Sequence, residues 1–124
     1  MAVRSGRLSR SADFERVYRR GRSQGNRHLV LYSFPRAAGE DDGPRLGVSV
    51  GRKVGGAVER NRVKRLLREA FRARAGDLPG DHDFVVVARP AAGELAERDG
   101  LAGVAAALDE LLGSAEAGNG ESPS

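Results

Sequence analysis

The sequence predicts one α/β domain in which helices pack against a sheet, and two observations support this fold class. Segments with strand character alternate with segments of helical periodicity, the strands at 28–36, 45–54 and 84–88 and the helices at 9–21, 57–74 and 94–112. A strand, a helix and a strand in succession imply a crossover that joins two parallel strands. At 124 residues the chain is long enough for one core and too short for two.

The first helix is predicted in SRSADFERVYRRG, residues 9–21. Ser11 suits the N-cap position, and Gly21 suits a C-terminal stop. Phe14, Val17 and Tyr18 are three and four residues apart, so they share one face of this helix.

The first strand is predicted in HLVLYSFPR, residues 28–36, and it ends at Pro35. Side chains alternate along a strand, so Leu29 and Leu31 point to one face of the sheet and Val30 and Tyr32 point to the other.

The second strand is predicted in RLGVSVGRKV, residues 45–54. One face carries the apolar residues Leu46, Val48 and Val50. The opposite face carries small residues, which let another chain approach closely, namely Gly47, Ser49 and Gly51. Two interpretations stay open, a bulged or barrel-corner strand and a groove that admits a ligand strand.

The helix at 57–74 is predicted to be amphipathic. Its apolar arc consists of Val63, Leu66, Leu67, Ala70 and Phe71. The other side carries Asn61, Lys64, Arg65, Arg68 and Arg72. We expect this helix to pack on the sheet and to keep its basic face outward.

The C-terminal part contains a buried strand, an acidic helix and a tail. The strand is Phe84 to Ala88. The helix is predicted to bury Leu101, Val104, Ala105, Leu108, Leu111 and Leu112. Residues 113–124, GSAEAGNGESPS, have almost nothing to bury and are predicted to be disordered. The domain is therefore expected to cover residues 1–112.

The net charge of +4 conceals two strongly basic blocks. Residues 1–36 carry nine arginines against two acids, and residues 45–74 carry ten Arg or Lys against two acids. Residues 75–124 carry ten acids against two arginines. This asymmetry indicates a polyanionic partner. Nearly all the basic residues are arginine, whose planar fork binds phosphate bidentately and stacks on bases.

Several classes of protein are not supported by the sequence. The chain has no cysteine, no secretory signal and no apolar run of about 18 residues, so we expect a cytoplasmic protein with no membrane partner. It has no phosphate-binding glycine motif, and we expect no small-molecule cofactor. Asp81, His82 and Asp83 point in different directions and do not predict a metal site. Nothing predicts catalysis by the chain alone.

The run GRKVGGAVERNRVKRLLREAFR, residues 51–72, resembles the bacterial ribonuclease P protein family, which has an RNR helix. Here that motif is Arg60, Asn61 and Arg62. The similarity extends in order through RLSRSADFERVYRRG, RHLVLYSF, LGVSV and DFVVVARP, so it covers about residues 7–90.

The resemblance implies a fold and an activity. The fold is an α/β sandwich with a mixed sheet of about four strands and a left-handed β-α-β crossover around the RNR helix, an exception to the usual hand. An N-terminal and a C-terminal helix flank the sheet. The protein joins a catalytic RNA, and the holoenzyme, an endoribonuclease, removes the 5′ leader of precursor tRNA. Mg²⁺ held mainly by the RNA activates the water, and the protein alone is inactive.

The resemblance also implies two sets of binding residues and no catalytic residue in the protein. Those for the catalytic RNA are Arg52, Lys53, Arg60, Asn61, Arg62, Lys64, Arg65 and Arg68. Those for the leader are Phe14, Tyr18, Val30, Tyr32 and Ser49, in a cleft between the first helix and the sheet. Aromatic rings suit unpaired nucleotides because every base has a π-face. Tyr18 stands where many relatives have Phe, which stacking tolerates.

Alternatives remain at three points. For Phe14, the alternative to leader binding is that the ring packs in the core. For Arg60, the alternative to RNA binding is that its side chain extends along the sheet edge. Gly55 and Gly56 are expected to leave backbone N–H groups open to an anion at the helix start. The alternative function is a structural RNA-binding module, such as a ribosome-associated protein, without a role in processing.

Overall fold

The computed structural model describes residues 6–7, 11–36 and 43–116. The elements in chain order are β1 (Gly6–Arg7), α1 (Ser11–Arg20), β2 (Arg22–Gly25), β3 (Leu29–Pro35), β4 (Arg45–Val50), α2 (Ala57–Arg74), the 3-10 helix η1 (Ala75–Asp77), β5 (His82–Ala88) and α3 (Ala91–Glu116). The predicted helices and strands are therefore present, with β4 ending at Val50 rather than Val54.

The strands form one mixed sheet in the order β1-β4-β5-β3-β2. β4 and β5 are parallel neighbours, with Gly47 opposite Val85, and α2 connects them. This confirms the predicted crossover between parallel strands, while its left hand stays a prediction. β5 and β3 are antiparallel, with Val85 opposite Tyr32. The two outer strands were not predicted, because β1 has two residues and β2 is the polar tetrapeptide RSQG.

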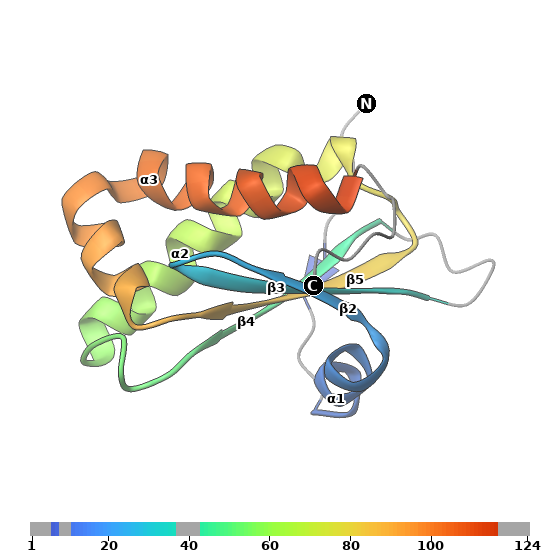
Figure 1. The fold of residues 1–124 in the computed structure, drawn as a ribbon, viewed down its shortest axis with the longest axis horizontal. Helices are drawn as coiled ribbons and strands as arrows, with labels where there is room; N and C mark the ends of the chain where they lie inside the picture. Colours follow the sequence, from blue (N-terminus) through green and yellow to red (C-terminus); the bar gives the residue numbers. More distant parts are fainter. Residues whose placement is uncertain (1–5, 8–10, 37–42, 117–124) are drawn as a thin grey trace.

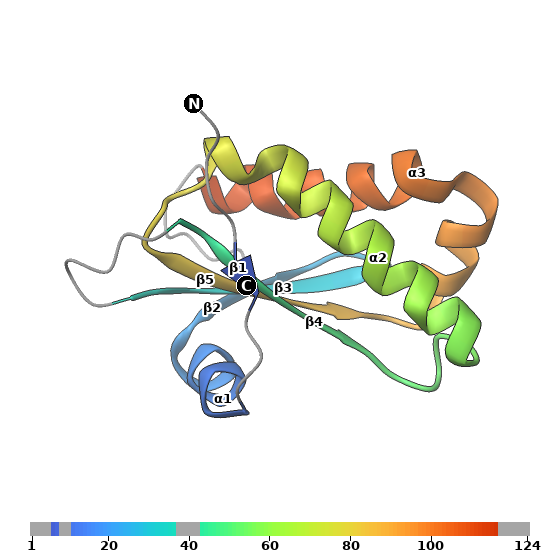
Figure 2. The same ribbon diagram turned by 180° about the vertical axis from the view of Figure 1, so that it is seen from behind.

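Helices cover both faces of the sheet. α2 and α3 lie side by side on one face, and α1 lies alone on the other (Figures 1 and 2). α1 ends at Arg20, and the N–H of the following Gly21 donates to the carbonyl of Val17 at 2.9 Å, as expected of a glycine stop. The Ser11 side chain, predicted as the N-cap, lies outside the described residues.

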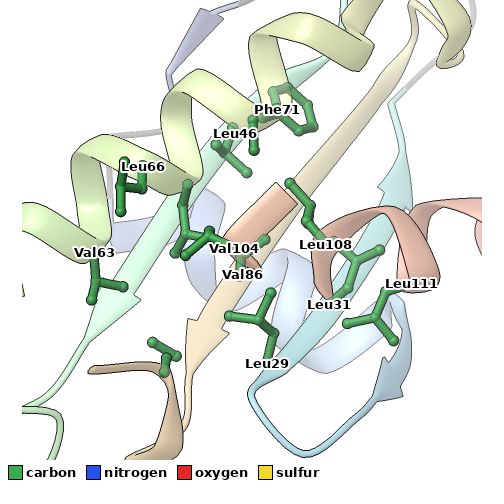
Figure 3. Close-up of a cluster of buried hydrophobic side chains, with 14 of the residues drawn as sticks. Leu29, Leu31, Leu46, Val63, Leu66, Phe71, Val86, Val104, Leu108 and Leu111 are labelled. Carbon is green, nitrogen blue, oxygen red and sulfur yellow. The ribbon is translucent and has the colours of Figure 1, made fainter. Parts of the chain in front are cut away.

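The main core lies between the sheet and the helix pair. The five apolar residues predicted for α2 are all buried, and they meet Leu29, Leu31, Leu46 and Val86 of the sheet (Figure 3). Phe71 and Phe84 pack edge to face, with ring centroids 5.5 Å apart. This burial fixes the rotation of α2 about its axis, so the polar side of the helix must point away from the sheet.

The C-terminal helix differs from its prediction in two respects. It has a kink at Gly100, where φ is 59°, and the helical stripe is interrupted there. Leu101 follows the kink and is 43% exposed, so its predicted burial is wrong. Val104, Leu108, Leu111 and Leu112 are buried as predicted, and Ala105 is half-buried.

The helix continues to Glu116, and residues 117–124 of the predicted disordered tail lie outside the described residues. No helix in the described part of the chain is both long and apolar enough to cross a bilayer.

Candidate nucleic-acid interfaces

The face of the sheet that α1 covers carries an aromatic cluster, which we define as Phe14, Tyr18 and Tyr32. Strand alternation places Tyr32 of β3 and Val85 of β5 side by side on this face. Val17 of α1 is fully buried here with Val85, and Phe14, Tyr32, Phe34 and Val87 pack around them. This small second core attaches α1 to the sheet.

The three rings contact one another and stay accessible. The ring centroids of Phe14 and Tyr18 are 6.3 Å apart, and those of Tyr18 and Tyr32 are 4.9 Å apart with planes at 83°. Tyr18 is 38% exposed, and Phe14 and Tyr32 are half-buried. Phe14 therefore packs against the second core but is not enclosed by it. Rings in this state have free surface on which bases can stack.

The two other residues predicted for leader binding lie in the next row of the same face. Ser49 of β4 is opposite Val87 of β5, which is opposite Val30 of β3. Burial raises the pKa of Tyr18, the neighbouring Ser49 side chain opposes that rise, and Tyr32 adds to it. The structure thus brings all five predicted residues to one side of the sheet. Gly47 shares that side, whereas Gly51 lies beyond the end of β4.

The residues predicted to bind the catalytic RNA follow the outer side of α2 and the turn before it. Arg52, Lys53, Asn61 and Arg65 are exposed. The remaining four are half-buried, namely Arg60, Arg62, Lys64 and Arg68. We call these eight residues the basic surface. Within the described residues, no carboxylate forms an ion pair with any of them.

Two details modify the expectations for the start of α2. The Arg60 side chain turns back to its own helix, with Nε 3.4 Å from the carbonyl of Gly56. The Glu59 side chain also lies over the N-terminal end of α2. If Gly56 had a Cβ, that atom would be 3.0 Å from the Oε1 of Glu59. The Glu59 carboxylate therefore lies beside Gly55 and Gly56, whose backbone N–H groups were expected to be open to an external anion.

The sequence did not single out Arg7, which the structure adds to the basic surface. β1 pairs with β4 so that Arg7 is opposite Leu46, whose side chain faces the helix pair. Burial lowers the pKa of Arg68, and the charge of the nearby Arg7 lowers it further. Two cations that repel each other favour the binding of an anion between them. No spacing motif could have predicted this pair, because 61 residues of chain separate its members.

Other arginines of the two basic blocks are engaged inside the protein. Arg16, Arg36 and Arg45 all contact the carboxylate of Asp83, and Arg74 contacts Asp109 at 2.8 Å. Counting charges along the sequence therefore overstated the positive charge available to a partner. In the described part of the chain, the eight residues of the basic surface are not engaged in this way, and further exposed arginines lie outside it, namely Arg20, Arg22, Arg27, Arg72 and Arg89.

Comparisons with known proteins agree on one family. The family model described as Ribonuclease P matches residues 3–113. A ribonuclease P protein component from Clostridium acetobutylicum is 45% identical over 89 residues, which cover 72% of this chain and 74% of the relative. One from Acidothermus cellulolyticus is 44% identical over 107 residues, 86% of this chain and 85% of the relative.

Solved structures give the same result. The RNase P protein of Staphylococcus aureus superposes with a TM-score of 0.79 at 33% identity, covering 94% of this chain and 100% of that one. The RNase P protein of Thermotoga maritima superposes with a TM-score of 0.73 at 36% identity, covering 84% of this chain and 92% of that one. The similarity thus extends over the helices and strands that carry both interfaces.

Proposed function

The chain belongs to the ribonuclease P protein family and is a subunit of ribonuclease P in tRNA processing, and from this premise we propose how its two interfaces divide the work. The basic surface binds the catalytic RNA, and the aromatic cluster with Val30 and Ser49 binds the 5′ leader of precursor tRNA. The family assignment decides against the alternative of a ribosome-associated structural module.

The observation that carries this division is the placement of the two residue sets on different sides of the molecule. α1 lies on one face of the sheet and α2 lies on the other (Figure 2). The aromatic cluster is on the α1 side, and the buried stripe of α2 against the sheet leaves its basic side outward. A large RNA and a single strand can therefore bind at the same time. The chemistry also differs, because arginine side chains neutralise phosphates whereas rings stack on unpaired bases.

In this proposal the RNA carries the catalysis and the protein increases affinity for the substrate. Mg²⁺ would be held mainly by the RNA and would supply the activation of the attacking water; the described residues of the protein contain no cluster of His, Cys, Asp or Glu side chains that could hold it. The protein neutralises phosphates that would otherwise repel each other and would need metal ions to screen them. The need for the protein should therefore be greatest at low Mg²⁺.

Reconstitution tests the proposal as a whole. We expect the purified chain to cleave nothing alone and to restore leader removal at low Mg²⁺ when it is added to the catalytic RNA of its own organism. The measurement is the rate of 5′ maturation with and without the chain. Cleavage by the protein without RNA would contradict the assignment of catalysis to the RNA.

A second experiment tests the leader interface. Tyr32→Ala should weaken the binding of substrates with a leader by about 5- to 150-fold, because stacking of one base contributes roughly 1–3 kcal/mol. It should leave assembly with the catalytic RNA intact. Tyr32→Phe keeps the ring and serves as the matched control with near-normal affinity. An equal loss for tRNA without a leader would show that Tyr32 does not bind the leader.

A further inference from the structure

We propose that Asp83 is a positioning residue for leader binding: through Arg16 it holds α1 at the place on the sheet where Tyr18 meets Tyr32. The proposal rests on the function proposed above and adds two residues that do not touch the leader themselves. It starts from a buried carboxylate that binds arginines from three other segments of the chain.

Asp83 is the second residue of β5, and its side chain is fully buried. In the sheet it lies between Arg45 of β4 and Phe34 of β3, on the face that α1 covers. Arg45 donates from Nε to Oδ1 at 2.7 Å and from Nη2 to Oδ2 at 2.9 Å. Arg36 donates from Nη1 to Oδ1 at 2.6 Å, and Arg16 donates from Nη2 to Oδ2 at 3.2 Å.

The two arginines on the sheet side hold the carboxylate still. Arg36 is buried and also donates to the backbone carbonyls of Gly43, Gly80 and His82. Burial alone raises the pKa of Asp83, but the hydrogen bonds from Arg45 and Arg36 outweigh it and keep the pKa below its ordinary value. Asp83 is therefore an ionised acceptor in a fixed position, to which a third arginine can attach.

Of the three arginines, Arg16 comes from α1. Its guanidinium carbon also lies 5.6 Å above the ring centroid of Phe34. The remaining contacts of α1 with the sheet described above are apolar or aromatic, with Val17 on Val85 and the rings of Phe14 and Tyr18 beside them. An apolar contact has no direction and tolerates sliding, whereas a charged hydrogen bond fixes both a distance and an angle. The contact between Arg16 and Asp83 therefore sets where α1 lies along the sheet.

That position determines the aromatic cluster. Asp83 is in the sheet row next to the row that holds Val85 and Tyr32, and Tyr18 follows Arg16 by two residues. Tyr18 belongs to α1 and Tyr32 to β3, so the centroid distance of 4.9 Å between them depends on the placement of the helix. A shift of α1 along the sheet changes this ring pair before it changes the sheet itself.

A direct role for Arg16 is the competing explanation, in which its charge binds a leader phosphate. The two explanations differ for Asp83→Asn. This substitution raises the formal net charge of +4 by one, so an account based on charge alone expects binding of the leader to stay equal or to become tighter. The positioning role expects weaker binding of the leader, although the protein becomes more positive.

The experiment uses the reconstituted holoenzyme with three protein variants, Asp83→Asn, Arg16→Gln and the control Arg19→Gln. Arg19 is also on α1 but is exposed and contacts Glu15 instead of Asp83. Affinity is measured for precursor tRNA with a leader and for tRNA without one, over a range of salt concentrations. We expect the first two variants to lose about five- to tenfold in affinity for the leader substrate only, with an unchanged salt slope. Arg19→Gln and the affinity of every variant for the catalytic RNA should stay at the wild-type level.

The free protein offers a readout that does not depend on RNA. Tyr18 and Tyr32 are the two tyrosines of the chain, so fluorotyrosine labelling gives two ¹⁹F resonances that both report on the ring pair. We expect Arg16→Gln to shift both resonances while the circular dichroism of the fold is retained, and Arg19→Gln to leave them in place. If Asp83→Asn does not fold, Arg16→Gln carries the test.

Two results would overturn the proposal. One is that Arg16→Gln leaves the tyrosine resonances and the leader affinity unchanged. The other is that Arg16→Gln lowers the salt slope by about one unit without moving the resonances, which would show a direct phosphate contact. A failure of the proposed function looks different, because the wild-type holoenzyme would then bind tRNA with and without a leader equally well.

Discussion

At the scale of single residues, Asp83 engages three arginines inside the protein that a count along the sequence would assign to RNA binding. Without this carboxylate, Arg16, Arg36 and Arg45 would place three cations around one point of the sheet. Removing one member of a buried pair costs about 3–5 kcal/mol, a large share of the roughly 5–15 kcal/mol that stabilises a typical domain. The same residue therefore contributes to the stability of the fold and to the position of α1.

The lowered pKa of Asp83 predicts how this stability depends on pH. The pKa of an unfolded Asp is about 3.9, and that of folded Asp83 is lower. The contribution is therefore complete above about pH 4 and is lost as the pH falls through the folded pKa. We expect the difference in the free energy of unfolding between wild type and Asp83→Asn to be constant from pH 7 to about pH 5 and to shrink below pH 4. Urea titrations at each pH measure it, and a constant difference down to pH 2 would contradict the assignment.

Arg65 and Arg68 carry the prediction for the basic surface. If each contacts a phosphate, the double change to Ala should weaken binding of the catalytic RNA and reduce the slope of log affinity against log salt by roughly one unit per lost contact. Arg98→Ala is the matched control, since Arg98 is on α3 and pairs with Asp99. An unchanged slope in the double variant would refute phosphate contact at these positions.

At the scale of elements, α3 supports the turn that carries Arg52 and Lys53. Gly93 in the first turn of α3 lies against the backbone of Val54, and a Cβ there would be 2.4 Å from the Val54 carbonyl oxygen. Real Cβ atoms do not approach an oxygen so closely, so either the helix or the turn must move. The absence of a side chain at Gly93 thus lets α3 pack directly on the turn after β4.

Gly93→Ala tests this contact. We expect it to lower the free energy of unfolding by roughly 1–3 kcal/mol, as overpacking usually does, and to weaken binding of the catalytic RNA by displacing Arg52 and Lys53. Gly113→Ala is the control on the same helix, because nothing lies within 4 Å of a Cβ there, and it should be neutral or stabilising by up to about 1 kcal/mol. Equal denaturation midpoints for the two variants would rule out the close approach.

At the scale of the whole molecule, the two helices that share a face of the sheet present opposite charges. α2 presents the basic surface, whereas the exposed acids of the described part of α3 are Glu94, Glu97, Asp99, Asp109 and Glu110. A polyanion is attracted to the first and repelled by the second. We therefore expect the acidic half of the sequence to help orient the protein on its RNA.

The absence of native cysteine allows a direct test of this orientation. A crosslinker attached at Glu69→Cys on α2 should react with the catalytic RNA, and one attached at Glu97→Cys on α3 should react with it much less. Both substitutions remove one negative charge from an exposed helical position, so they are matched. Equal crosslinking from the two sites would contradict the proposed orientation.

The sequence by itself determined the features that depend on local periodicity. The five buried residues of α2, the alternation that places Tyr32 opposite to Leu29 and Leu31, and the shared face of Phe14 and Tyr18 were all predicted, because a side chain's direction in a helix or strand follows from its position in the repeat. Where the repeat is interrupted, at Gly100, the prediction for Leu101 failed.

The tertiary structure alone decided which distant charges meet. Asp83 is separated by 67, 47 and 38 residues from Arg16, Arg36 and Arg45, and β1 brings Arg7 to Arg68. No local repeat encodes such contacts, since they depend on which strands become neighbours in the sheet. The same dependence explains why β1 and β2 were missed, because strands this short are stabilised mainly by the strands beside them.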